Sequence, residues 1–94
     1  MGKEEDRIKK IRDRAMKSSE KGDIGIDELL EFLKSENPEI RKIAVDVLRE
    51  IIGKNPEAIK DYISDLDFLL EDEEEYVRWN TAFGIGEIAM NFPE

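Results

Sequence analysis

The sequence predicts an all-α protein, a short stack of about five antiparallel helices. Three observations lead to this prediction. Apolar residues recur at spacings of three and four through most of the chain, the period of a helix that is buried on one side. Helix start signals, an Asn followed by a Pro, occur at Asn37 and again at Asn55. The second half of the chain also repeats the pattern of the first at a separation of 37 residues.

Composition limits the function before any motif is considered. The chain has 94 residues, enough for one domain with a modest core, and contains neither Cys nor His. Disulfides, thiolate metal sites and His-based catalytic triads are therefore excluded, and we expect no catalytic residue, metal or cofactor. No apolar run reaches the roughly 20 residues of a membrane span, and the amino terminus lacks an apolar signal segment. We therefore expect a cytoplasmic protein, and the absence of Gln beside abundant Glu, Lys and Ile is typical of a thermophilic source.

Residues 3–21 are predicted to form a first helix that caps the stack. Ile8, Ile11 and Ala15 give it a narrow apolar stripe, and Gly22 is expected to end it. A second stripe, about 100° around the helix, is basic; its residues are Arg7, Lys10, Arg14, Lys17 and Lys21. The favoured interpretation is a solvated face, and the alternative is docking on an acidic surface.

The net charge of −9 is unevenly spread. Residues 1–22 carry a net charge of +3, whereas residues 23–94 carry −12. The body of the protein would repel a phosphate backbone, and only the first helix could attract one. A nucleic-acid partner is therefore disfavoured.

Two helix pairs are expected after the first helix, over residues 26–55 and 56–94 of a single domain. A short helix over 26–34 should bury Ile26, Leu29, Leu30 and Leu33. A longer helix should begin at Pro38, end at Gly53 and bury Ile40, Ala44, Val47, Leu48, Ile51 and Ile52. A third helix, over 56–71, should bury Ile59, Tyr62, Ile63, Leu66, Leu69 and Leu70. The last helix should run over 76–93.

The internal repeat is more than compositional bias. Aligned at 37 residues, nine of 35 positions are identical, where this composition gives about three by chance. The repeated core carries a hydrophobic residue followed by Arg at Arg41 and Arg78. The first copy has Glu39, Ile40, Arg41, Ala44, Leu48 and Ile51, and the second has Val77, Arg78, Ala82, Ile85, Gly86, Glu87 and Ile88.

These residues resemble the HEAT-repeat superfamily, including the lyase-type HEAT-like repeats. The resemblance implies a short right-handed α-solenoid made of a capping helix and two HEAT-like helix pairs. It also implies an Asp six residues before each repeated Arg, which Asp72 supplies before Arg78, whereas Ser35 stands there before Arg41. On the helical wheel Arg41 falls inside the apolar sector, so its stem should pack while its head reaches a carbonyl or a carboxylate at the helix junction. We interpret Arg41, Arg78 and Asp72 as structural.

The last helix departs from its counterpart on the side opposite the predicted core. The first copy has Lys42, Asp46, Arg49 and Gly53 there, and the second has Trp79, Phe83, Gly86 and Met90, with Tyr76 at the edge. A helix that is apolar nearly all round is a buried helix. A further repeat of a longer protein, self-association about a two-fold axis or a protein partner would each bury this face. A fourth reading is that the ring of Trp79 folds back and leaves little exposed.

The sequence therefore predicts a non-enzymatic module that binds another protein or itself. Binding would use the aromatic face, Tyr76, Trp79, Phe83, Gly86 and Met90, or the ridge that bears Glu50, Asn80 and Glu87. Two alternatives from other classes stay open: a DNA-binding, repair-type HEAT-like protein that uses the basic first helix, and a component of a lyase-type enzyme. The acidic run 71–75 lacks the spacing of a calcium loop and stands at a helix start, where acidic residues are favoured.

Overall fold

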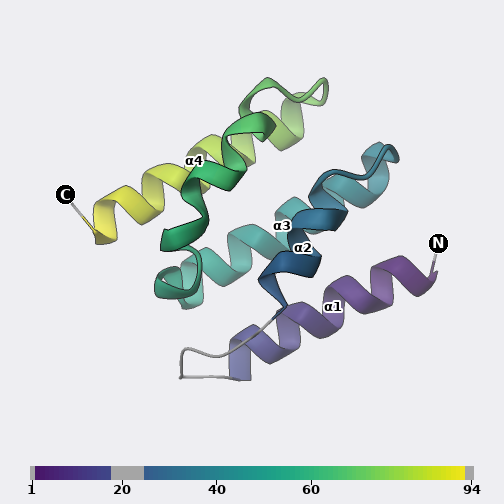
Figure 1. Cartoon of the computed structure of the whole chain (residues 1–94), viewed down its shortest axis with the longest axis horizontal. Coiled ribbons are helices and arrows are strands. Elements are labelled where there is room, and N and C mark those ends of the chain that lie inside the picture. The colour runs from purple at the N-terminus through teal and green to yellow at the C-terminus, as the bar shows by residue number, and fades with distance from the viewer. Residues whose placement is uncertain (1, 18–24, 93–94) are drawn as a thin grey trace.

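The computed structural model describes residues 2–17 and 25–92, and the side chains of these residues except 15–17 (Figure 1). Its elements are α1 (Gly2–Lys17), α2 (Ile26–Leu33), α3 (Pro38–Lys54), two 3₁₀ segments, η1 (Pro56–Ala58) and η2 (Lys60–Glu71), and α4 (Glu75–Asn91). No strand occurs in this part of the chain. The prediction of an all-α protein is confirmed.

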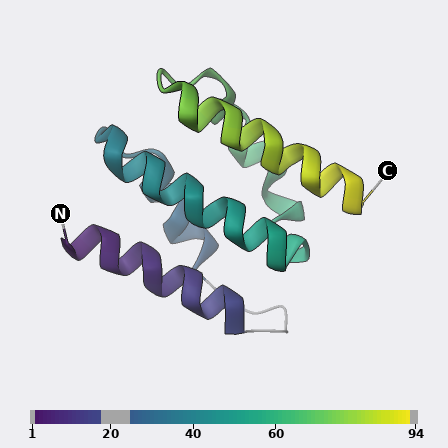
Figure 2. The same ribbon diagram turned by 180° about the vertical axis from the view of Figure 1, so that it is seen from behind.

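The helices lie in two layers. In Figure 2, α1, α3 and α4 lie side by side and run in the same direction. The shorter α2 and η2 form the second layer, which faces the viewer in Figure 1. Helix α3 is central, because it packs against α1, α2, η1 and α4. Apolar side chains from both layers fill the space between them.

The core matches the predicted apolar positions closely. Ile8 and Ile11 of α1 are fully buried, as are Leu29 and Leu33 of α2. All six residues predicted for α3 are buried: Ile40, Ala44, Val47, Leu48, Ile51 and Ile52. Leu30, Tyr62 and Ile63 pack against the core while partly exposed. Phe32 is buried although the helical pattern did not select it, and it lies beneath the guanidinium of Arg7.

Helices α3 and α4 reproduce the 37-residue repeat in their bounds and in their backbone contacts. Both have 17 residues, and they start and end 37 positions apart. Before α3 the Ser35 hydroxyl accepts from the amide of Asn37 at 3.1 Å, and before α4 the Asp72 carboxylate accepts from the amide of Glu74 at 2.8 Å. The two units therefore begin with the same capping turn, to which α3 adds the Asn37 side-chain cap that α4 lacks.

The segment over 56–71 is a 3₁₀ helix, not the predicted α-helix. Residues three apart lie on one face of a 3₁₀ helix, so Leu66 and Leu69 are buried together. Leu70, which α-helical spacing places in the core, is 40% exposed. A rise of about 2.0 Å per residue extends the 12 residues of η2 over about 24 Å, close to the length of about 25 Å for α4. The thinner helix can thus run beside the whole of α4.

The predicted end of the helix that begins at Pro38 differs from the structure. Gly53 does not end α3, which continues to Lys54 and closes with the Asn55 amide bonded to the Ile51 carbonyl at 2.6 Å. The described glycine with a positive φ is Gly25, at 84°, where the chain turns into α2. Predictions on Gly22, on residues 18–21 of the first helix and on the side chain of Ala15 lie outside the described part of the chain.

Candidate functional site: the open face of α4

One side of α4 is taken up by α3. Asn80 and Gly84 lie on this side, and Glu87 lies beside Gly53 of α3. A Cβ added at Gly84 would come within 2.8 Å of Cδ1 of Ile52. Such an approach leaves no room for a larger side chain. The two helices are therefore in close contact along their length.

The outward side of α4 carries large apolar side chains with no cover among the described residues. Trp79 is 58% exposed, Phe83 62% and Met90 84%. Between them Ala82, Gly86 and Ala89 are exposed too, and nothing lies within 4 Å of a Cβ placed on Gly86. We call these six residues, Trp79, Ala82, Phe83, Gly86, Ala89 and Met90, the open face of α4. The alternative in which Trp79 folds back onto the protein is wrong.

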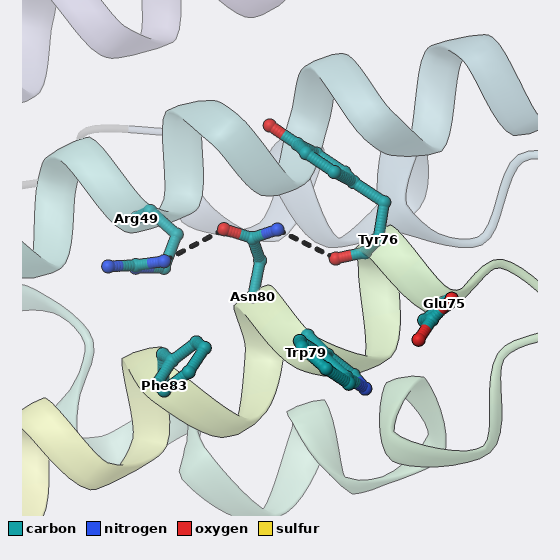
Figure 3. Close-up of a pocket in the computed structure, with 6 residues that line it drawn as sticks. All are labelled: Arg49, Glu75, Tyr76, Trp79, Asn80 and Phe83. Atoms are coloured by element: carbon teal, nitrogen blue, oxygen red, sulfur yellow. Dashed lines mark hydrogen bonds between the residues drawn. The ribbon is translucent and has the colours of Figure 1, made fainter.

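A polar chain of contacts joins α4 to α3 beside this face (Figure 3). The guanidinium of Arg49 donates to the Asn80 side-chain oxygen at 2.8 Å, and the Asn80 amide donates to the carbonyl oxygen of Tyr76 at 2.7 Å. Arg49 also lies 5.8 Å from the ring centre of Phe83, within range of a cation–π contact. These residues line an open pocket with Trp79 and Glu75. Its shape suits a partner's surface better than a small ligand, which is usually enclosed.

Tyr76 belongs to the contact with α3 more than to the open face. Its hydroxyl donates to the carboxylate of Asp46. The hydrogen bond to Asp46 raises the pKa of Tyr76 above its usual value, because it favours the neutral phenol, and desolvation adds to the rise. Of the five predicted aromatic-face residues, Tyr76 is thus the one whose side chain forms a hydrogen bond among the described residues.

An Arg–Asp pair joins the two repeat units. Nε of Arg41 lies 2.9 Å from one Asp72 oxygen and Nη2 lies 3.1 Å from the other, and both side chains are largely buried. The remaining Arg41 nitrogen donates to the Ser35 carbonyl at 2.8 Å. These are the carbonyl and carboxylate contacts that the helical wheel predicts for Arg41. The second unit repeats one of them, because Arg78 donates to the Asp72 carbonyl at 2.7 Å.

The predicted polar ridge does not form one site. Glu50 borders the groove between α1 and α3, whose lining also includes Lys9 and Arg12. Asn80 is held between Arg49 and Tyr76. Glu87 accepts the Asn91 side-chain amide on its carbonyl at 2.9 Å. The structure gives these residues separate surroundings.

The basic stripe of α1 is partly used within the fold. Arg7 forms an ion pair with Glu28 of α2 and lies 5.6 Å from the ring centre of Phe32. Arg14 lies against Gly25, whose added Cβ would be 3.2 Å from Nη2. Lys10 is exposed. The side chain of Lys17 and the whole of Lys21 fall outside what the structure describes.

Sequence reasoning placed Lys42, Asp46, Arg49 and Gly53 on an outer side of α3 opposite the core. The structure places α4 against them. Lys42 lies 3.6 Å from Glu74, and Asp46 accepts a hydrogen bond from Tyr76. Arg49 donates to Asn80, and Gly53 lies beside Glu87. The signal that could have revealed this is the repeat itself. A stack with a 37-residue period must bury the same side of each unit against the next one.

Other classes of site receive little support from the described residues. They contain no group of three or more acidic side chains placed to hold a metal ion. Within the same residues, no helix has both the length and the apolar character that crossing a bilayer requires. Comparisons with protein-family models, curated proteins and solved structures find no match.

Proposed function

We propose that this protein is a non-enzymatic, HEAT-like binding module, a short right-handed α-solenoid of the cytoplasm that docks a protein partner on the open face of α4. The observation that carries the proposal is the exposure of Trp79, Phe83 and Met90 on one side of one helix. Contiguous apolar surface of this kind marks interaction sites on proteins. Trp is also the residue type most often found among the energetically dominant residues of interfaces.

The solenoid part of the proposal is supported by the equivalence of the two units. Equal helix bounds, the same capping turn and the same Arg-to-carbonyl contact recur at 37 residues. Units that stack in this way bury one side against the preceding unit and present the other to the next one. The open face of α4 is the presented side.

The test compares the molar mass and the partner binding of two variants. Trp79→Glu places a charge on the open face, whereas Phe68→Glu makes a similar change on η2, where Phe68 is 43% exposed. Light scattering over a range of concentrations reports self-association, and affinity capture from cell extract with the same variants reports other partners. We expect association to be lost in Trp79→Glu and kept in Phe68→Glu.

Two results would contradict the proposal. One is a partner or a dimer that Trp79→Glu retains at unchanged affinity. The other is a loss of association that is equal in both variants, because that would assign the effect to general surface charge. Circular dichroism of each variant confirms that the helices are intact, and the exposure of Trp79 predicts that they are.

A further inference from the structure

The way in which α3 holds α4 indicates what the open face of α4 would hold. The α3 side of this contact includes Asp46, Arg49 and Ile52, and Arg41 binds Asp72 just before α4. The counterparts of Arg41, Asp46, Arg49 and Ile52 37 residues later are Arg78, Phe83, Gly86 and Ala89. All but Arg78 belong to the open face. The open face is therefore the surface on α4 that matches the part of α3 already covered by a parallel helix (Figure 2).

Arg78 lies at the edge of this face and, unlike its counterpart Arg41, pairs with no carboxylate among the described residues. Arg41 binds one carbonyl through Nη1, its Nη2 donates to the Asp72 carboxylate, and its Nε lies 2.9 Å from the other oxygen of that carboxylate. Arg78 makes the carbonyl contacts, to Asp72 and Glu73, through Nη1 alone. Among the described residues no carboxylate lies on its other nitrogens. The guanidinium thus presents the fork that Asp72 fills on Arg41, beside an otherwise acidic turn.

The side chains of α3 that contact α4 differ in size and polarity from their counterparts on the open face of α4. Arg49 and Ile52 are large and meet the small or polar Gly84 and Asn80. Their counterparts on α4, Gly86 and Ala89, are small, and Phe83 takes the place of Asp46. A helix on α4 would therefore need large apolar side chains where α4 itself has Tyr76, Asn80 and Gly84.

We infer that the partner of this face is an α-helix of another protein that lies parallel to α4 and is preceded by a carboxylate that binds Arg78. The inference rests on the proposed function and specifies its partner. In α4, Tyr76, Asn80 and Gly84 lie four, eight and twelve residues after Asp72. The partner has apolar residues four, eight and twelve residues after its own carboxylate. They contact Phe83, Gly86 and Ala89 respectively.

Helices α3 and α4 of a second copy of this chain do not meet this description. Asp72, the carboxylate that precedes α4, is already bound to Arg41 and largely buried. The corresponding position before α3 is Ser35, which cannot form an ion pair. These two helices of a second copy are therefore excluded as the source, and a dimer is an outcome that the experiment must exclude.

The experiment selects helices from a displayed library against the full chain. Each member is an Ala, Gln and Lys-rich segment of more than about 15 residues, the length at which isolated helices begin to form. Four positions are randomised: one before the helix and those four, eight and twelve residues later. The expected binders have Asp or Glu at the first position and apolar residues at the other three. Trp79, the single Trp of the chain, reports binding of a Trp-free member through its fluorescence.

Two variants of the chain sharpen the selection. Against Arg78→Gln the preference for an acidic first residue should disappear, and a selected peptide should bind about tenfold more weakly, as expected for loss of a bidentate charged contact. Gly86→Leu adds a side chain to the open face at a position where nothing lies within 4 Å of the new Cβ, and it should reduce binding at least as much. Lys10→Leu, which adds the same side chain on exposed α1, should bind normally.

The outcomes separate this inference from the proposed function. Binders with no acidic preference, or with a preference that Arg78→Gln leaves intact, overturn the inference even if Trp79→Glu abolishes them. A library with no member sensitive to Gly86→Leu overturns it as well. Peptide-induced change in Trp79 fluorescence that coincides with dimerisation of the chain would assign the face to a second copy. The proposed function is judged separately, by the association of Trp79→Glu and Phe68→Glu.

Discussion

Thr81 is a buried hydroxyl in the place where the first repeat has an apolar residue. It is 1% exposed, and Oγ1 has no hydrogen-bond partner in the described structure. Its counterpart Ala44 is fully buried and has no polar side-chain atom. A buried polar group without a partner destabilises a fold by about 1–3 kcal/mol. We expect Thr81→Val, which keeps the shape, to raise the free energy of unfolding in urea by about 1 kcal/mol.

Thr81→Ser is the matched control for this prediction, because it keeps the hydroxyl and removes the methyl group. It should lower the free energy of unfolding. If Thr81→Val left stability unchanged or reduced it, the hydroxyl would have to contribute favourably to the native state.

The hydrogen bond from Tyr76 to Asp46 should make part of the stability depend on alkaline pH. The pKa of Tyr76 is raised in the folded protein, chiefly by this bond, so the neutral phenol is the form that stabilises the fold. Its contribution is complete below the unfolded pKa of about 10 and is lost as the pH rises through the higher folded pKa. We expect Tyr76→Phe to be less stable than the wild type at neutral pH and the difference to vanish at strongly alkaline pH.

Urea unfolding of both proteins across the alkaline range measures this effect, and absorbance of tyrosinate follows the ionisation directly. Tyr62→Phe serves as the control, since the remaining Tyr76 should preserve the pH dependence. A stability difference that persists unchanged at high pH would contradict the assignment to the phenol proton.

The two glycines of α4 differ in surroundings although they are two residues apart. A side chain at Gly84 meets Ile52, which is buried, whereas one at Gly86 meets nothing. Overpacking a close contact usually costs about 1–3 kcal/mol. We expect Gly84→Leu to lower the free energy of unfolding by this amount, while Gly86→Leu should raise it by up to about 1 kcal/mol because Leu favours helix over Gly.

Thermal unfolding followed by circular dichroism compares these isomeric variants directly. Equal effects would show that helix propensity alone governs both sites. A destabilised Gly86→Leu would place an unseen neighbour on the open face.

At the level of elements, the sequence predicted those helices whose apolar residues follow the α-helical period. The bounds of α3 and α4 follow from the repeat and the Asn37 cap, whose side chain accepts from the Glu39 amide at 2.9 Å. The 3₁₀ form of η2 could not be predicted, because Leu66, Leu69 and Leu70 satisfy either period until the packing against α4 selects one. The sequence predicts that Arg41 binds a carbonyl or a carboxylate. It does not identify Asp72 as the partner, because the two residues lie 31 positions apart and meet only when the units stack.

For the open face too, the sequence pattern predicts one part and the tertiary packing determines the other. The exchange of Lys42 and Asp46 for Trp79 and Phe83 is visible in the sequence, and both aromatic side chains are exposed on α4. What the exchange could not reveal is that the corresponding side of α3 is covered. That information is tertiary, and it shows that the open face of α4 corresponds to a covered side of α3.

In the whole molecule, α3 should be the most protected element, since it alone packs against both layers and both neighbouring long helices. Seven of its side chains are at least nine-tenths buried: Ile40, Ala44, Val45, Val47, Leu48, Ile51 and Ile52. We expect its central amides to exchange hydrogen most slowly, with η2 faster because 3₁₀ hydrogen bonds are weaker. Hydrogen exchange followed by mass spectrometry tests this order, and equal protection of η2 would contradict it.

The parallel arrangement of α1, α3 and α4 also has an electrostatic consequence. Three helices that run in one direction align their dipoles, so their positive amino-terminal ends gather at one edge of the layer. Acidic residues occupy the first turn of each: Glu4 and Glu5 in α1, Glu39 in α3 and Glu75 in α4. They face the positive ends of these helices and stabilise them. Within the acidic run 71–75, Glu75 is thereby explained as a counterpart to the backbone.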